Sequence, residues 1–211
     1  MNISRTVRAG PSSARGCRGA GRGSGVGDMG LSFRTGSRHL RCMTRNRKAR
    51  PVQIATPIPD RHLAGAARLW WGAFAPPLRG PSPPIRASHG IAAIGPGGSV
   101  AGVAGFRDHE GGLLSRPPVL ARLLFRPAPP TGDLVIDGIV VDRLRHGTGR
   151  ALLDAAARVA RRAGRPALRA EVELRNRPAM AFYAATGFAE IGRGDFGWPW
   201  SGPVAILRRP L

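Results

Sequence analysis

Apolar positions change their period several times along the chain, and these changes divide the first half into strands and a helix. Leu, Ala and Trp residues recur at helical spacing after Asp60, a suitable N-cap, so a helix is expected to run to about Phe74. Before it, residues 52–55 form a short apolar run that predicts a strand. Two further runs, 91–94 and 99–106, flank a Gly-Pro-Gly-Gly turn and predict a β-hairpin.

The second half of the chain alternates strands with helices. Residues 134–141 are strongly β-prone, and Gly138 within them predicts a bulge or a close approach by another backbone. A long amphipathic helix is expected from about Gly149 to a C-cap at Gly164. Shorter apolar runs predict a helix at 118–125, a strand at 167–174, a helix at 178–186, and strands at 188–191 and 204–208.

The first 50 residues differ in composition from the remainder. They are rich in Gly, Ser and Arg, lack apolar periodicity, and carry twelve of the 33 basic residues but one of the twelve acidic ones. Such a segment cannot bury enough apolar surface to offset its conformational entropy. We therefore expect a disordered basic extension at 1–50 and a folded domain at 51–211. The extension also resembles a transit peptide, and a third interpretation places the native start at Met43.

The net charge of +21 comes almost entirely from arginine, since Lys48 is the only lysine. A charge of this size is compatible with a nucleic-acid partner. Abundant Arg, Ala, Gly and Pro are also typical of a GC-rich coding sequence, which makes nucleic acid the less favoured interpretation. Cys17 and Cys42 both precede the predicted domain, which fits a reducing cytoplasm. No apolar run has the length of a transmembrane helix, so no membrane contact is expected.

The segment that joins the strand at 134–141 to the long helix has the composition of an anion-binding turn. It reads Arg145, His146, Gly147, Thr148, Gly149, Arg150. The N–H groups at a helix N-terminus lack partners and carry the positive end of the helix dipole, and glycines let a phosphate approach the backbone. The segment therefore suits a pyrophosphate. An ordinary strand-to-helix turn has the same appearance.

A second motif makes the pattern more specific. Its positions form the series Asn-x-x-Ala-x-x-x-Tyr-x-x-x-Gly-Phe and are occupied by Asn176, Ala179, Tyr183, Gly187 and Phe188. Together with the glycine-containing turn, this series resembles the GCN5-related N-acetyltransferase (GNAT) family over residues 133–190.

The turn departs from that family at one position. The family usually has Arg or Gln three residues before the first glycine of the turn, where this chain has Leu144. The departure places the affinity for the cofactor in question.

The resemblance implies an α/β fold with a mixed, mostly antiparallel sheet of six or seven strands. Helices would cover both faces, and the fourth and fifth strands would splay apart. It also implies direct transfer of an acetyl group from acetyl-CoA, the acyl-donor co-substrate, to an amine of a small molecule or protein, with no metal. The helix predicted at 118–125 would cover the acceptor site.

The resemblance further implies roles for single residues. The pantetheine arm would pair with the backbone of Ile139, Val140 and Val141, where an N–H group would stabilise the oxyanion. Residues 145–150 would hold the pyrophosphate, and Asn176 would contact the cofactor near the fifth strand. The catalytic pair would be Tyr183, which protonates the leaving thiolate, and Asp137, which takes the proton of the amine.

Each of these catalytic roles has a structural alternative. Tyr183 could be a packing aromatic, and Asp137 could support a bulge or pair with an arginine. Glu171 and Glu173 share one face of the fifth strand, as an alternative base, an amine-binding pair or a solvated surface.

Other functions also fit the sequence. They are transfer of a different acyl group, a catalytically silent acyl-CoA-binding or regulatory domain, and an arginine-rich nucleic-acid-binding protein. A monomer or a homodimer is expected.

Overall fold

The computed structural model describes residues 52–74, 82–115, 123–144 and 146–211. In order, the elements within these ranges are β1 (Gln53–Ala55), α1 (Asp60–Phe74), the 3-10 turn η1 (Ala87–His89), β2 (Gly90–Ile94), β3 (Val100–Arg107), β4 (Leu134–Val141), α3 (Thr148–Arg162), β5 (Ala167–Glu173), α4 (Arg177–Ala184), β6 (Ala189–Gly194) and β7 (Val204–Pro210). None of the helices in these ranges has the length and apolar character needed to cross a bilayer.

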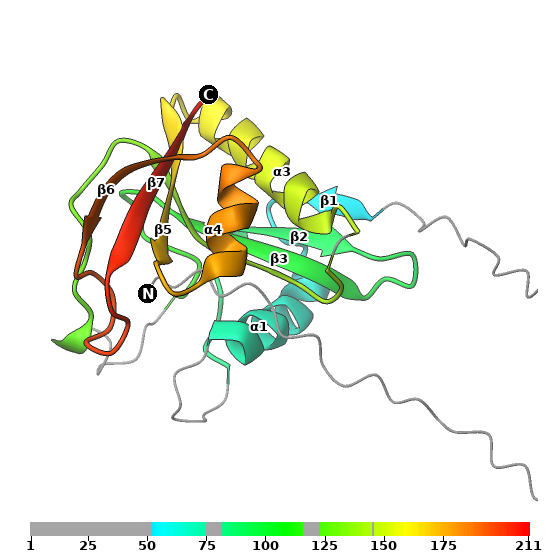
Figure 1. The fold of residues 1–211 in the computed structure, drawn as a ribbon. Helices are drawn as coiled ribbons and strands as arrows, with labels where there is room; N and C mark the ends of the chain where they lie inside the picture. Colours follow the sequence, from blue (N-terminus) through cyan, green and yellow to red (C-terminus); the bar gives the residue numbers. More distant parts are fainter. Residues whose placement is uncertain (1–51, 75–81, 116–122, 145) are drawn as a thin grey trace, which may run out of the picture. The chain divides into compact units, whose positions relative to one another are not determined.

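The strands form one seven-stranded mixed sheet in the order β1-β2-β3-β4-β5-β7-β6 (Figure 1). Neighbours are antiparallel except β4 and β5, which run parallel and are joined through α3. A parallel pair needs such a crossover, because its strands start at the same edge of the sheet. The predicted α/β fold and its mostly antiparallel sheet are thereby confirmed.

Helices cover both faces of the sheet, as predicted (Figure 1). On one face, α3 and α4 pack over the central strands, and Leu152 of α3 lies with Ile136 and Leu168 in one buried apolar cluster. On the opposite face, Trp70 of α1 lies in a second cluster with Val103. Two apolar layers therefore enclose the sheet.

Most predicted elements appear within one or two residues of their expected bounds. The strand at 134–141 is β4, and α3 begins at Thr148, one residue before the expected start. Gly164, expected as its C-cap, adopts φ +64° in a Schellman motif after the helix. The helix predicted at 118–125 and the extension at 1–50 fall largely or wholly outside the described residues.

A β-bulge interrupts β4 where the sequence placed one. Gly105 of β3 pairs with Gly138, and Phe106 pairs with Ile136, so Asp137 is the extra residue. The close approach at Gly138 is by a side chain rather than by backbone. A Cβ on Gly138 would lie 2.6 Å from Cζ of Phe74 on α1.

Replacement of Gly138 by Ala is expected to destabilise the domain by about 1–3 kcal/mol, because the added methyl group overpacks the contact with Phe74. The control is Gly192→Ala in β6, where an added Cβ meets nothing within 4 Å. Urea unfolding of the two variants measures the difference. Equal free energies of unfolding for the two variants would show that the contact with Phe74 does not require a glycine at position 138.

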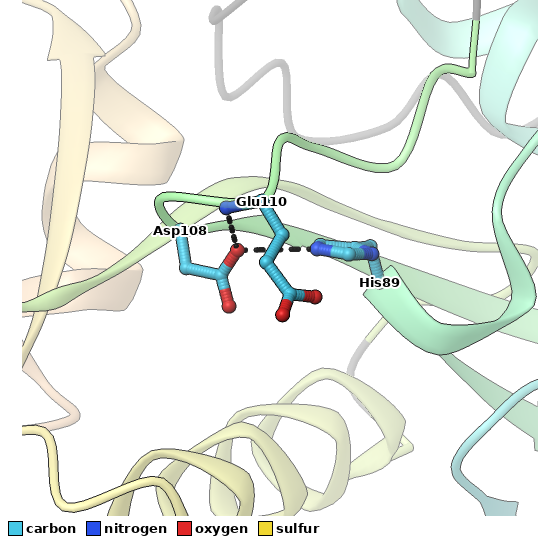
Figure 2. A group of neighbouring side chains, drawn as sticks. All are labelled: His89, Asp108 and Glu110. Carbon is cyan, nitrogen blue, oxygen red and sulfur yellow. Dashed lines mark hydrogen bonds and ion pairs between the residues drawn. The ribbon is translucent and has the colours of Figure 1, made fainter.

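A histidine–carboxylate group holds the open end of the β2–β3 hairpin (Figure 2). Nε2 of the buried His89 lies 3.2 Å from Oδ1 of Asp108, and the Glu110 N–H donates to the same oxygen at 2.9 Å. Partial burial works against the charged form of Asp108, but these contacts outweigh it and lower the pKa of Asp108. The group therefore ties the residue before β2 to the segment after β3.

A lowered pKa gives Asp108 a pH-dependent effect on stability. Its contribution is fully present above the unfolded pKa of about 4 and is lost as the pH falls through the lower folded value. We expect Asp108→Asn to lower the free energy of unfolding at neutral pH by about 1 kcal/mol. Urea unfolding at several pH values should show this difference shrink below about pH 4. A difference independent of pH would contradict the assignment.

Candidate active site

The fourth and fifth strands separate halfway along their length. They pair at Leu134–Leu168, Val135–Arg169 and Ile136–Ala170, and not beyond. β4 nevertheless continues to Val141 against β3, and β5 continues to Glu173 against β7. The facing edges of 137–141 and 171–173 are therefore not paired with each other, as the predicted splay requires.

The N-terminus of α3 follows the splayed end of β4. Gly147 precedes the helix with φ +76°, no side chain caps it, and a Cβ there would meet nothing within 4 Å. Among the described residues, no acceptor is bonded to the N–H groups of Thr148, Gly149 and Arg150. The turn thus offers three backbone donors and the positive end of a helix dipole.

The first turn of α3 lies against α4. A Cβ on Gly149 would lie 3.4 Å from the Phe182 ring, and the Arg150 guanidinium donates to the Ala185 carbonyl at 3.1 Å. The sequence alone assigned Arg150 to phosphate binding, and the structure gives its side chain this second contact.

The remaining residues predicted to bind the cofactor occupy different surroundings. His146 is exposed, Ile139 is half-buried, and Arg145 lies outside the described residues. Val140 and Val141 are buried in the clusters on opposite faces of the sheet, so only their backbone lies along the strand edge.

The motif around α4 corresponds to the two ends of that helix. Asn176 is the N-cap, and its Oδ1 accepts from the Ala179 N–H at 3.3 Å. Gly187 has φ +87°, and the Phe188 N–H donates to the Tyr183 carbonyl at 3.0 Å, which forms a Schellman motif. The spacing of the motif is thus accounted for by helix capping before any cofactor is considered.

Tyr183 lies in the core on the face covered by α3 and α4. It is 2% exposed, and its ring packs edge-on against Phe182 and Phe188, with centroids 5.4 and 5.0 Å away. A buried tyrosine hydroxyl needs a polar partner, and Tyr183 makes contacts besides these ring contacts. The packing role considered from the sequence is therefore present.

Asp137 belongs to a buried group of charges on the face covered by α1. Arg107 donates to Asp137 at 2.9 Å and to Glu171 at 2.8 Å, and Arg169 lies 3.1 Å from the same Glu171 oxygen. Burial works against the charge of Arg107, but the two carboxylates outweigh it and raise the pKa of Arg107. Asp137 therefore has the arginine partner considered as its structural alternative, directly at the splay.

Sequence reasoning did not anticipate Arg107 as the centre of this group. Arg107 is the last residue of the apolar strand β3 and lies 64 positions from Glu171, so only the sheet register brings the two together. The available signal was the alternation of Arg169, Glu171 and Glu173 with apolar residues in a short strand. β5 is buried along its whole length, so these charges require partners.

His89, Asp108 and Glu110 offer metal-ligand atoms that all lie within 4.8 Å of one another (Figure 2). The bond between His89 and Asp108 already pairs two of these side chains, and Glu110 is exposed. The group is therefore accounted for as a structural tie.

The chain matches the family model described as acetyltransferase (GNAT) family over residues 61–188. A GCN5-related N-acetyltransferase from Kribbella flavida has a similar structure, with a TM-score of 0.52 and 20% identity over 76% of this chain and 98% of that one. Ard1 from Thermoplasma volcanium has a TM-score of 0.54 and 16% identity over 76% of this chain and 98% of its own. The yncA protein of Salmonella typhimurium, solved with its cofactor acetyl-CoA, has a TM-score of 0.51 and 15% identity over 77% of this chain and 95% of its own. No curated protein sequence matches.

At these identities the similarity to solved structures establishes the fold and not the reaction. The family model covers more than half of the chain and runs from α1 to Phe188. It includes the splayed strands, the turn before α3 and both caps of α4. The chain therefore belongs to the GNAT acetyltransferase family.

Proposed function

We propose that this protein is an acetyl-CoA-dependent N-acetyltransferase that moves the acetyl group directly to an amine of a small molecule or protein. The observation that carries the proposal is the combination of two features. The facing edges of β4 and β5 are not paired with each other, and β4 leads into a helix N-terminus with three N–H groups that have no acceptor among the described residues. One feature suits an extended arm, and the other suits a pyrophosphate.

The residues present fit this co-substrate. The N–H groups of Thr148, Gly149 and Arg150 would hold the pyrophosphate, Arg145 would add positive charge, and His146 would add a ring hydrogen-bonding group. The open space at Gly147 leaves room for the phosphates. The backbone of Ile139–Val141 would hold the pantetheine arm and orient the thioester carbonyl. Acetyl-CoA supplies the acyl group and a thiolate leaving group.

The acceptor must lose a proton before it attacks, because a lysine-like amine with a pKa of about 10 is almost fully protonated at neutral pH. In our proposal Asp137 takes that proton, directly or through water. Glu171 is the alternative base, since Arg107 binds both carboxylates and holds them near one point. Arg107 would position them and is not itself the base.

Tyr183 would protonate the thiolate as the C–S bond breaks. Its burial supports this role, because a water-excluded site strengthens the interaction of a donor with developing charge. A catalytically silent acyl-CoA-binding domain is the second candidate, favoured by Leu144 at the position where the family usually has Arg or Gln. The cytoplasm stays the proposed compartment, because Cys17 and Cys42 precede the domain.

Cofactor binding is tested at Gly147, whose positive φ strains any other residue. We expect Gly147→Val to weaken acetyl-CoA binding on the order of tenfold by reshaping the turn before α3. Gly164→Val is the matched control, since Gly164 also has a positive φ and open surroundings but follows the opposite end of α3. Both variants should lose about 1–3 kcal/mol of stability. Calorimetry should find weaker acetyl-CoA binding in Gly147→Val alone. Equal acetyl-CoA affinities of the two variants would contradict the assignment of the pyrophosphate to this turn.

Catalysis is tested by Tyr183→Phe, which keeps the packed ring and removes the hydroxyl. If the hydroxyl protonates the thiolate, kcat should fall about a hundredfold, while acetyl-CoA affinity stays nearly constant, because the charge develops only in the transition state. The measurement is thiol release together with the Kd of acetyl-CoA. An unchanged rate would leave Tyr183 as a packing residue. Binding of acetyl-CoA with no turnover of any amine in the parent protein would favour the silent domain.

A further inference from the structure

Glu173 is the last residue of β5, and one of its two carboxylate oxygens has no hydrogen-bond partner among the described residues. Its side chain is 4% exposed, and Oε2 accepts from Nε of Arg175 at 2.7 Å. Oε1 is buried, and it is the one buried carboxylate oxygen in the described residues without a hydrogen-bond partner. Because an unpaired buried acceptor is unfavourable, this oxygen indicates a place for a donor from outside the chain.

The position of Glu173 relates it to the proposed reaction centre. It lies beyond Ala170, the last residue of β5 that pairs with β4, and therefore borders the splay. Alternate residues of a strand share a face and are separated by about 7 Å. Glu173 is thus about 7 Å along the strand from Glu171, which Arg107 holds beside Asp137.

Arg175 is a replaceable partner for Glu173. Its side chain is 58% exposed, and its one ion pair among the described residues is with Glu173. Arg107, in contrast, is 25% exposed and bridges two buried carboxylates. Only the Arg175 end of this pair lies in solvent, so a cation on a ligand can take the place of its guanidinium beside the buried Glu173 carboxylate.

An aromatic turn lies at the same end of β5. The Leu174 N–H donates to the Pro203 carbonyl at 2.9 Å, which brings the segment before β7 beside this strand end. In that segment the rings of Trp198 and Trp200 stack with centroids 5.0 Å apart, and Trp200 is 48% exposed. The faces of tryptophan rings attract cations.

We infer that Glu173 binds a second cationic group of the acceptor. The acceptor is then a short diamine, or a basic amine whose ammonium or guanidinium group lies roughly 7 Å from the nitrogen that is acetylated. This inference rests on the proposed function. As the N–C bond forms and the C–S bond breaks, the amine proton passes to the base and the thiolate takes one from Tyr183, while Glu173 makes and breaks no covalent bond.

The test compares two diamines, putrescine and cadaverine, with butylamine, which lacks the second charge. Calorimetry on the full-length protein, with and without CoA, should show diamines binding on the order of tenfold more tightly than butylamine. Glu173→Gln should abolish that preference. Arg175→Gln should strengthen diamine binding several-fold, since it removes the competing guanidinium.

These opposite effects separate a binding role from a structural one. If both variants weaken diamine binding equally, or if the parent protein does not prefer diamines, the inference is wrong. Arg175→Gln alters an exposed side chain and tests the site even if Glu173→Gln does not fold. The control, Glu190→Gln, breaks the exposed Glu190–Arg193 pair and should leave diamine binding unchanged.

The proposed function is tested independently of this inference. Acetyl-CoA binding and thiol release with butylamine report on acetyl transfer and do not depend on Glu173. Diamine binding requires no turnover. Failure of one set of measurements therefore leaves the other interpretable.

Discussion

The separation of β4 from β5 is the constraint on which the proposed site depends. The two parallel strands pair only as far as Ile136 and Ala170, yet each remains bonded to its other neighbour. The bulge at Asp137 coincides with the point of separation, and the Phe74 ring packs over the adjacent Gly138. The strand edges beyond this point retain backbone groups that the sheet does not pair with each other, and such groups are what an extended ligand requires.

Buried carboxylates lie where the two strands separate, and Arg107 pairs with two of them. Charged side chains of β4 and β5 point toward the face covered by α1, where they are removed from water. Arg107 reaches both Asp137 and Glu171, which lie on different strands, and Arg169 also pairs with Glu171. Glu173 lies farther along the opening, and its one ion pair within the described part of the chain is with the exposed Arg175. Charge compensation is therefore most complete where the strands part and incomplete at the end of β5.

The opposite face shows how one segment serves folding and chemistry together. Asn176 caps α4 at its start, Gly187 and Phe188 close its end, and Tyr183 packs between these caps and the core. The family resemblance rests on these positions, and helix capping or core packing explains the residue type at each of them. Membership of the family is thus independent of whether the Tyr183 hydroxyl takes part in acetyl transfer.

The sequence by itself determined the elements, because strand and helix periods, glycine turns and caps act over a few residues. It placed β4, the bulge near Gly138, the start of α3 and the helix α4 that Gly187 ends, and the family resemblance supplied the splay. Tertiary structure alone decided which charges meet. Arg107 and Glu171 are joined by strand register, and the Glu173 oxygen that lacks a partner among the described residues is buried by distant segments. Local patterns carry no information about such contacts, since burial and ion pairing are set by residues far away in the chain.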